Sequence, residues 1–236
     1  MMKFDGINND ALLLLAENRF RDSRDFYEEH KELIKKTAVT PMRQIAAAVG
    51  EHISYVDPVM CTDPVKMVSR IRRDTRYTKD QHLYRENMWA MFMRPKYEWP
   101  HYPCMWFEFT PRMYTAGIGI FMQTPALLEY WRKAIRENTG QFLEALASVE
   151  KTGAVFEENL YKKPKDGCPP GLEKYYNAKA VWFVYASANL KELEDETIIN
   201  KLCGIYDAFA PMYAFFLGVS DEYVRETGGV SYRRRR

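Results

Sequence analysis

Six cationic side chains and two carboxylates crowd into the stretch SRIRRDTRYTKDQHLYR, residues 69–85. The guanidinium group of arginine is a planar fork that binds a phosphate or a carboxylate through two parallel hydrogen bonds. The stretch holds more positive charge than its own two acids can neutralise. It therefore predicts either a grip on an anionic ligand or, with acids from elsewhere in the chain, a salt-bridged brace. The basic residues are Arg70, Arg72, Arg73, Arg76, Lys79 and Arg85, and the acids are Asp74 and Asp80.

The hypothesis of a ligand grip gives each residue a role. Three arginines bind the anion, one lysine adds charge, and the two aspartates orient the guanidinium forks. Two tyrosines, Tyr77 and Tyr84, either stack on a base or anchor the loop. The predicted ligand-binding residues are Arg70, Arg73, Asp74, Arg76, Lys79 and Tyr84.

Two carboxylates are the candidates for acid–base catalysis, should the protein be an enzyme. Glu108 alternates with aromatic residues in PCMWFEF, so its side chain points either outward or inward toward the arginines. In the second case it is placed to act as a general base. Asp80 is the other candidate.

The period of the surrounding residues predicts the element that positions the basic stretch. VKMVSRIR alternates, which predicts a strand over residues 66–72. Arg70 and Arg72 then lie on one face of that strand and Ile71 on the other. The remaining charged residues fall at the strand end and in the following turn.

The same residues resemble the signature of a conserved family, a domain of unknown function. R-I-R-R-D-T-R-Y-T-K-D, followed by Tyr84, is similar to the family pattern R-I-x-R-D-x-R-[FY]-[ST]-K-D-K-x-P-Y-K. Arg85 and Gln81 stand where the family has lysine, and Leu83 stands where it has proline. LAENRFRDSRDFYEEHK, GIGIFMQTPALLEYWRKAI, YKKP and APMYAFFL resemble further blocks of the family, so the resemblance runs along most of the chain. It implies no particular reaction.

Several common catalytic motifs are absent from the sequence. There is no P-loop, and Gly117-Ile118-Gly119 lacks the third glycine of a dinucleotide-binding turn. The stretch GVSDE lacks the second glycine of a nucleophile elbow. The four histidines show no metal-binding spacing. We therefore expect no cofactor and no metal site.

The charge and cysteine content favour a cytoplasmic protein with a local basic patch. Lysine and arginine total 34 against 32 aspartates and glutamates, and Arg233–Arg236 supply four of these cations, so the rest of the chain is close to neutral. General nucleic-acid binders usually show a clear basic excess. The four cysteines form no C-x-x-C pair, which predicts reduced thiols. ALLLLA is typical of a buried helix rather than a signal peptide, and we expect no membrane span.

The order of predicted elements is typical of a single α+β domain, with a mostly antiparallel sheet packed against N-terminal, central and C-terminal helices. We expect helices capped by Ser23, Thr40-Pro41 and Thr124-Pro125, and a last helix from about Asp195 that Pro211 breaks or kinks. NMWAMFMR, PCMWFEFTP and RMYTAGIGIFM predict strands, and AVWFVYA predicts a fully buried one. The domain is expected to span residues 1–232, with a disordered basic tail over 233–236.

Two further features bear on the sheet. Gly117 and Gly119 share one face of their strand, where another group is expected to pack closely. Trp89, Trp99, Trp106 and Trp131 are expected in the core.

Three functions remain open from the sequence. The leading hypothesis is a pocket for a small ligand that carries a phosphate or carboxylate. The second is a nucleic-acid-binding module in which the basic stretch follows a phosphate backbone. In the third, the stretch is only a brace in a structural or interaction protein. The ligand and the oligomeric state stay undetermined. Forks that converge on a cavity favour the first, exposed forks the second, and fully paired forks the third.

Overall fold

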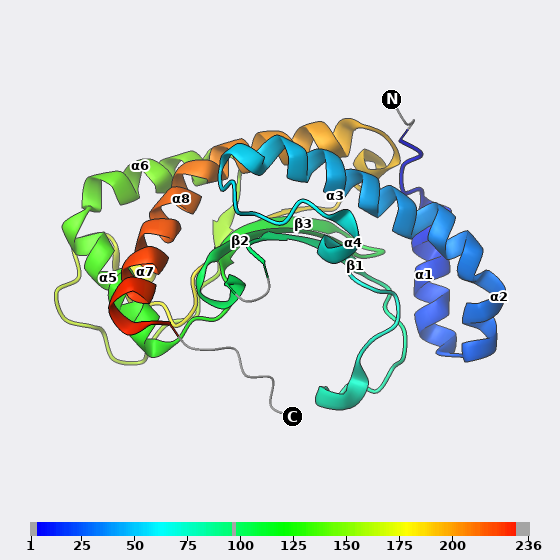
Figure 1. Ribbon diagram of the computed structural model, residues 1–236, viewed down its shortest axis with the longest axis horizontal. Helices are drawn as coiled ribbons and strands as arrows, with labels where there is room; N and C mark the ends of the chain where they lie inside the picture. Colours follow the sequence, from blue (N-terminus) through cyan, green and yellow to red (C-terminus); the bar gives the residue numbers. More distant parts are fainter. Residues whose placement is uncertain (1–3, 96–97, 230–236) are drawn as a thin grey trace.

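The protein has a single-domain α+β fold in which a five-stranded sheet carries helices on one face (Figure 1). The computed structural model describes residues 4–95 and 98–229, except for the side chains of Tyr77 and Trp99. The strand order is β1-β2-β3-β5-β4, and every neighbouring pair is antiparallel. This confirms the predicted fold class. The basic tail lies outside the described residues, and the predicted domain limits stay a prediction.

The four predicted strands after residue 87 are confirmed, and one short strand joins them. Alternate residues along β1 and β2 are buried and half-buried, because only one face of the sheet packs on the helices. The prediction that the last strand is buried on both faces is wrong, since Phe183 is its one fully buried residue. The strands are β1 Met88–Met93, β2 Pro103–Phe109, β3 Tyr114–Ile120, β4 Val155–Phe156 and β5 Trp182–Ser187.

The N-terminal helices begin as predicted but continue differently. The Ser23 hydroxyl accepts a hydrogen bond from the Phe26 N–H at 3.4 Å, which confirms the predicted cap. Thr40-Pro41 stands at the start of α3, as predicted, but Thr40 does not cap it, because the chain is already helical through a preceding π-helical turn. There the Thr40 N–H donates to the Lys35 carbonyl, and the widened turn leaves room for the proline ring. The elements are α1 Asn9–Arg21, α2 Arg24–Ile34, η1 Lys35–Val39, α3 Thr40–His52 and η2 Ile53–Tyr55.

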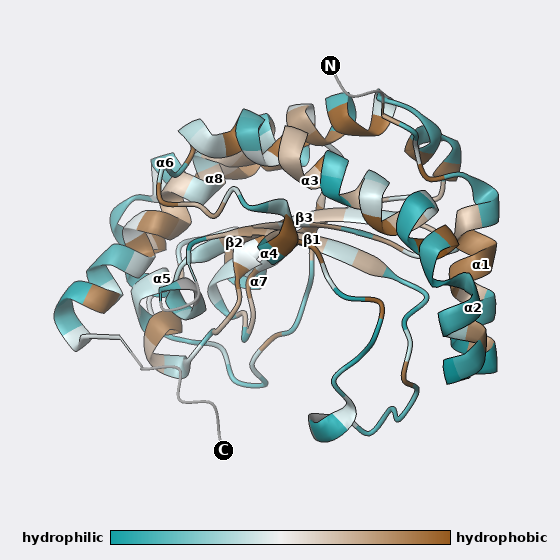
Figure 2. Cartoon of the chain, turned by 45° about the vertical axis from the view of Figure 1, so that its right-hand side comes forward, coloured by the Kyte–Doolittle hydropathy of each residue, from teal (hydrophilic) through white to brown (hydrophobic). Residues whose placement is uncertain are grey.

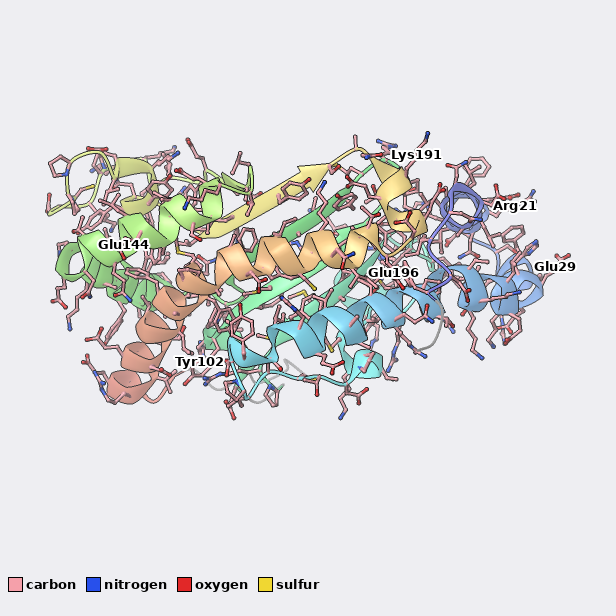
Figure 3. All side chains as sticks on the ribbon, turned by 90° about the horizontal axis from the view of Figure 1, so that it is seen from above. Arg21, Glu29, Tyr102, Glu144, Lys191 and Glu196 are labelled. Atoms are coloured by element: carbon pink, nitrogen blue, oxygen red, sulfur yellow. The ribbon has the colours of Figure 1, made fainter. Side chains whose placement is uncertain are left out.

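The later helices follow the predicted signals more closely. The Thr124 hydroxyl accepts the Leu127 N–H at 3.1 Å, with Pro125 in the first turn, so this cap is confirmed. The last helix continues through Pro211 and changes direction near its middle, as the predicted kink requires (Figure 3). The elements are α5 Pro125–Glu137, α6 Thr139–Glu150, α7 Glu173–Tyr176, α8 Thr197–Thr227 and the short turns α4 Pro64–Met67, η3 Thr75–Tyr77, η4 Trp99–His101 and η5 Leu190–Glu194.

The core lies between the sheet and the two helices that cross it, α3 and α8 (Figure 3). Figure 2 shows α2 mostly in hydrophilic colours, whereas the strands are mostly pale to hydrophobic. α8 is long and apolar enough to span a membrane by length and composition alone. Half of its most apolar window is buried inside the protein, as in the core helix of a globular domain.

A buried ion pair fixes the segment after α3 to both the sheet and α8. The Asp57 side chain is 1% exposed and accepts the Arg94 Nε–H at 2.7 Å. The Tyr213 hydroxyl of α8 donates to the same carboxylate at 2.9 Å. Burial, together with the Asp57 charge, raises the pKa of Tyr213. Removing the acid would leave Arg94 and Tyr213 with unmatched donors in a dry site.

We therefore expect Asp57→Ala to lower the free energy of unfolding by about 3–5 kcal/mol, because it strands a largely buried guanidinium. Tyr213→Phe removes one donor and leaves the ion pair, so we expect a loss of about 1–2 kcal/mol. Urea unfolding measures both. The control is Glu32→Ala, which breaks an exposed pair with Lys35 and is expected to cost less than about 1 kcal/mol. Equal losses for Asp57→Ala and Glu32→Ala would contradict the buried brace.

Candidate functional site

The basic stretch forms a projecting loop of residues 69–87, here called the arginine arm, which leads into β1 (Figure 1). Its two limbs pair antiparallel at Arg72 and Tyr84. The Arg73 N–H donates to the Leu83 carbonyl at 2.8 Å, and the Arg85 N–H donates to the Ile71 carbonyl at 3.0 Å. These backbone bonds make the arm a defined element rather than an unpaired loop.

The predicted strand over residues 66–72 is wrong in its first half. Pro64–Met67 is a short helix, because Asp63 caps it by accepting the Val65 N–H at 3.0 Å and Pro64 suits the first helical position. Beyond it, only isolated bridges form, at Val68 and Arg72. The predicted alternation still holds, since Ile71 is buried whereas Arg70 and Arg72 are exposed.

Asp80 is the centre of a cluster of ion pairs at the base of the arm. Its carboxylate accepts from Arg19 Nη2 at 2.8 Å, from Arg73 Nη1, and from His82 Nδ1 at 2.7 Å. These bonds, led by that from Arg19, lower the pKa of Asp80 strongly. Asp80 therefore stays ionised over the whole ordinary pH range. That state suits the predicted role of orienting a guanidinium fork better than the role of acid–base catalyst.

Further contacts from the first two helices anchor the arm. The Asp22 carboxylate, in the left-handed residue that ends α1, accepts the Leu83 N–H at 2.6 Å. Arg19 Nη1 donates to the Tyr84 carbonyl at 3.0 Å. The Tyr84 ring is 2% exposed and stacks on Tyr27 of α2, with centroids 4.6 Å apart. Of the two roles considered for Tyr84, the structure supports the anchor and not contact with a ligand.

The tip of the arm is exposed. Arg76 forms a bidentate pair with Asp74, with Nε and Nη2 donating at 2.8 and 2.7 Å. Lys79 is exposed and lies outside the lining of the two pockets described next. The Tyr77 side chain lies outside the described residues.

Two adjoining pockets open on the arm. The larger one, here called the arginine pocket, has a volume of about 640 Å³, and five of its seven lining residues are arginines. The smaller one, the side pocket, has about 310 Å³. Arg73 and Arg85 line both. The arginine pocket is lined by Arg70, Arg72, Arg73, Asp74, Thr75, Arg76 and Arg85, and the side pocket by Arg19, Arg73, Asp80, Arg85, Glu86, Asn87 and Thr110.

Arg85 is a half-buried cation that forms no ion pair among the described residues. Its guanidinium lies 4.4 Å from the ring centre of Trp89, and its buried Nε–H has no hydrogen-bond partner among the described residues. Burial, together with the Arg73 charge, lowers the pKa of Arg85. The side chain remains cationic, so it is a partly desolvated charge without an acid beside it.

Glu108, the other predicted acid–base residue, lies near these pockets but lines neither. It is half-buried on β2, opposite Trp89 of β1 and Thr115 of β3. Its Oε1 accepts a hydrogen bond from the side chain of Asn87. A catalytic role for Glu108 stays a prediction.

Residue patterns missed part of this site. Arg19, Asp22 and Asn87 were not predicted, and Arg85 was counted as a cation without a role. The excess of cations over acids in the arm is the sequence feature that points to such partners, because it requires acids from other elements. Among the described residues, no group of three or more histidine, cysteine, aspartate or glutamate side chains could hold a metal ion.

Asp80→Asn tests the ion-pair cluster. We expect it to lower the free energy of unfolding at pH 7, because Arg19 and Arg73 lose their shared carboxylate. The folded pKa of Asp80 lies below its unfolded value, so its stabilisation is present above about pH 4 and lost as the pH falls further. The difference between wild type and Asp80→Asn should therefore shrink below pH 4 in urea unfolding. Glu144→Gln, an exposed substitution on α6 (Figure 3), is the control. A difference that stays constant with pH would contradict this assignment.

Comparison with known proteins agrees with the family resemblance of the arm. The sequence model of one family, described as "Conserved hypothetical protein (DUF2461)", matches residues 10–215. No curated protein matches the chain. The matched range contains most of α1, the arginine arm, the whole sheet and α8 as far as Phe215. The chain therefore belongs to the conserved hypothetical protein family DUF2461.

Proposed function

We propose that the arginine pocket binds the phosphate or carboxylate group of a small anionic ligand. The observation that carries this proposal is the lining of the pocket, which has five arginines and a single carboxylate, Asp74. That carboxylate already accepts two hydrogen bonds from the Arg76 guanidinium. An anionic group with several oxygens can accept hydrogen bonds from the other guanidinium groups that line the pocket.

The ion pairs divide the arginines into two groups. Arg73 pairs with Asp80, and Arg76 pairs with Asp74. Among the described residues, Arg70, Arg72 and Arg85 have no carboxylate within ion-pair distance. These three are the proposed principal donors to the ligand, and Arg73 and Arg76 complete the wall of the pocket.

The ion pairs that stabilise the arm and the arginines proposed to bind the anion therefore belong to the same loop. Asp80 and Asp22 hold the backbone of the arm and the Arg73 guanidinium against α1 before a ligand arrives. Such preorganisation lowers the entropy lost on binding. A flexible arginine-rich loop would lose much more side-chain freedom when it closed on an anion.

The nucleic-acid alternative is supported less well. Arg70 and Arg72 are exposed, as a backbone contact requires, but the chain outside its C-terminal arginines is close to neutral. A backbone-tracking site also gains most of its affinity from the release of counterions, which makes it strongly dependent on salt. A pocket for a single anionic group depends on salt much less steeply.

The proposal is tested by titrating the protein with pyrophosphate and with citrate, followed by calorimetry and thermal unfolding. A ligand at 100 times its dissociation constant should stabilise the native state by about 2.7 kcal/mol. We expect the double variant Arg70→Ala/Arg72→Ala to lose at least about tenfold in affinity, because each charge-assisted bond contributes about 1.5–3 kcal/mol. The urea stability of this variant should stay near that of wild type, since neither side chain is part of the brace.

The matched control is Arg225→Gln, which removes one charge from a side chain that is 72% exposed on α8. It should bind both anions as wild type does. Equal affinities for wild type and the double variant would show that the anion binds elsewhere. Binding of neither anion by wild type would contradict the proposed function.

A further inference from the structure

The sheet face opposite α3 and α8 carries side chains that the core does not cover. They alternate with the buried residues along β1, β2 and β5, and each is half-buried or exposed. This set of side chains is here called the open face. It consists of Trp89, Met91, Met93, Trp106, Glu108, Thr115, Trp182, Val184 and Ala186. The expectation that Trp89 and Trp106 lie in the core is corrected by this placement, whereas Trp131 is 1% exposed, as expected.

Three tryptophans lie on the open face, one each on β1, β2 and β5, and are here called the tryptophan stripe. Trp89 lies opposite Glu108, and Trp106 lies opposite Met91, so the two indoles are diagonal neighbours across the pair β1 and β2. Trp106 and Trp182 meet edge to face, with ring centroids 5.3 Å apart. The stripe therefore runs from the edge strand β1 to β5.

Two glycines make this stripe possible. A Cβ atom at Gly117 would lie 2.0 Å from the Trp106 ring, and one at Gly119 would lie 2.2 Å from the Trp182 ring. Both indoles thus lie over the β3 backbone, where any larger residue would displace them. This confirms the expectation that another group packs closely against these two glycines.

The stripe begins at the arginine pocket. Arg85 lines that pocket and also lies over the Trp89 ring. A ligand that occupies both the arginine pocket and the tryptophan stripe therefore has a negatively charged group at one end and a planar or apolar group at the other. Polar groups lie beside the rings as well, since Glu108 accepts one bond from Asn87 through Oε1 and its other oxygen has no partner among the described residues. That oxygen is placed to accept a hydrogen bond from an amino group of a ring.

We propose that the ligand is a nucleotide, with its phosphate in the arginine pocket and its base stacked on the tryptophan stripe. This inference rests on the proposed function and specifies its ligand class. Aromatic side chains stack on any base, because every base has a π-face, and arginines beside them neutralise the phosphate. A sugar phosphate or an inorganic anion uses the arginines and leaves the indoles uncovered.

The experiment compares AMP, ribose 5-phosphate and pyrophosphate as ligands of the wild-type protein, by calorimetry and by tryptophan fluorescence. We expect AMP to bind at least about fivefold more tightly than ribose 5-phosphate, the lower end for one base–aromatic stack. AMP should also change the tryptophan emission more than pyrophosphate does, because pyrophosphate reaches only Arg85 beside Trp89 and leaves the other two indoles uncovered. Equal affinities for AMP and ribose 5-phosphate would overturn the inference while leaving anion binding intact. Binding of none of the three would contradict the proposed function itself.

Two variants separate the base site from the phosphate site. Trp106→Ala removes an indole, and Gly117→Ala displaces the same indole without removing it. We expect each variant to lower the affinity for AMP by about tenfold and to leave the affinity for pyrophosphate unchanged. Unchanged pyrophosphate binding also shows that the arginine arm of the variant is folded. The matched control is Phe20→Ala, which removes an aromatic side chain that is 88% exposed on α1 and should change neither affinity.

Two other occupants of the open face are outcomes of the same experiment. In one outcome, an adenine oligonucleotide binds much more tightly than AMP and loses affinity steeply as the salt concentration rises. That result would show that the ligand is a single-stranded nucleic acid and not a free nucleotide. A stable dimer that Trp106→Ala converts to a monomer, in sedimentation without ligand, would show that a second copy covers the stripe. Either result would overturn the proposal.

Discussion

The carboxylate of Asp80 holds the guanidinium groups of Arg19 and Arg73 at one point, and the geometry of the arginine arm depends on it. Without this anion, three neighbouring cations at the base of the arm would repel one another, because Arg85 lies close to both. With it, the arm is fixed beside α1. The remaining arginines that line the arginine pocket form no bond with this acid.

The second constraint is the one-sided covering of the sheet. α3 and α8 bury one face (Figure 3), and on the other face Trp106 and Trp182 lie over glycines of β3. Large aromatic side chains on a partly exposed sheet face are costly in water unless they serve an interaction. Their continuity with Arg85 joins the two halves of the candidate site. The arm supplies charge, and the sheet supplies a flat apolar surface.

Much of the fold follows from local patterns. The alternating stretches became β1, β2 and β3, since alternation puts one set of side chains against the helices. Ser23 and Thr124 cap helices because their hydroxyls reach N–H groups three residues later. Thr40-Pro41 carries the same local signal and stands at the start of α3, but Thr40 makes no side-chain cap. There a π-helical turn and the packing of α3 on the sheet keep the chain helical across the proline.

The sequence by itself determined the fold class, most strands and capped helices, and the excess of arginine over acid in the arm. These depend on residues within one or two turns of each other, whose spacing is visible along the chain. Only the tertiary structure decided which arginines are paired, because Arg19 and Asp22 reach the arm from about sixty residues away. It also decided which sheet face stays open, since alternation shows that a strand has two faces but not which one the helices cover. That choice depends on long-range packing, and it determines which tryptophans lie in the core and which lie on the open face.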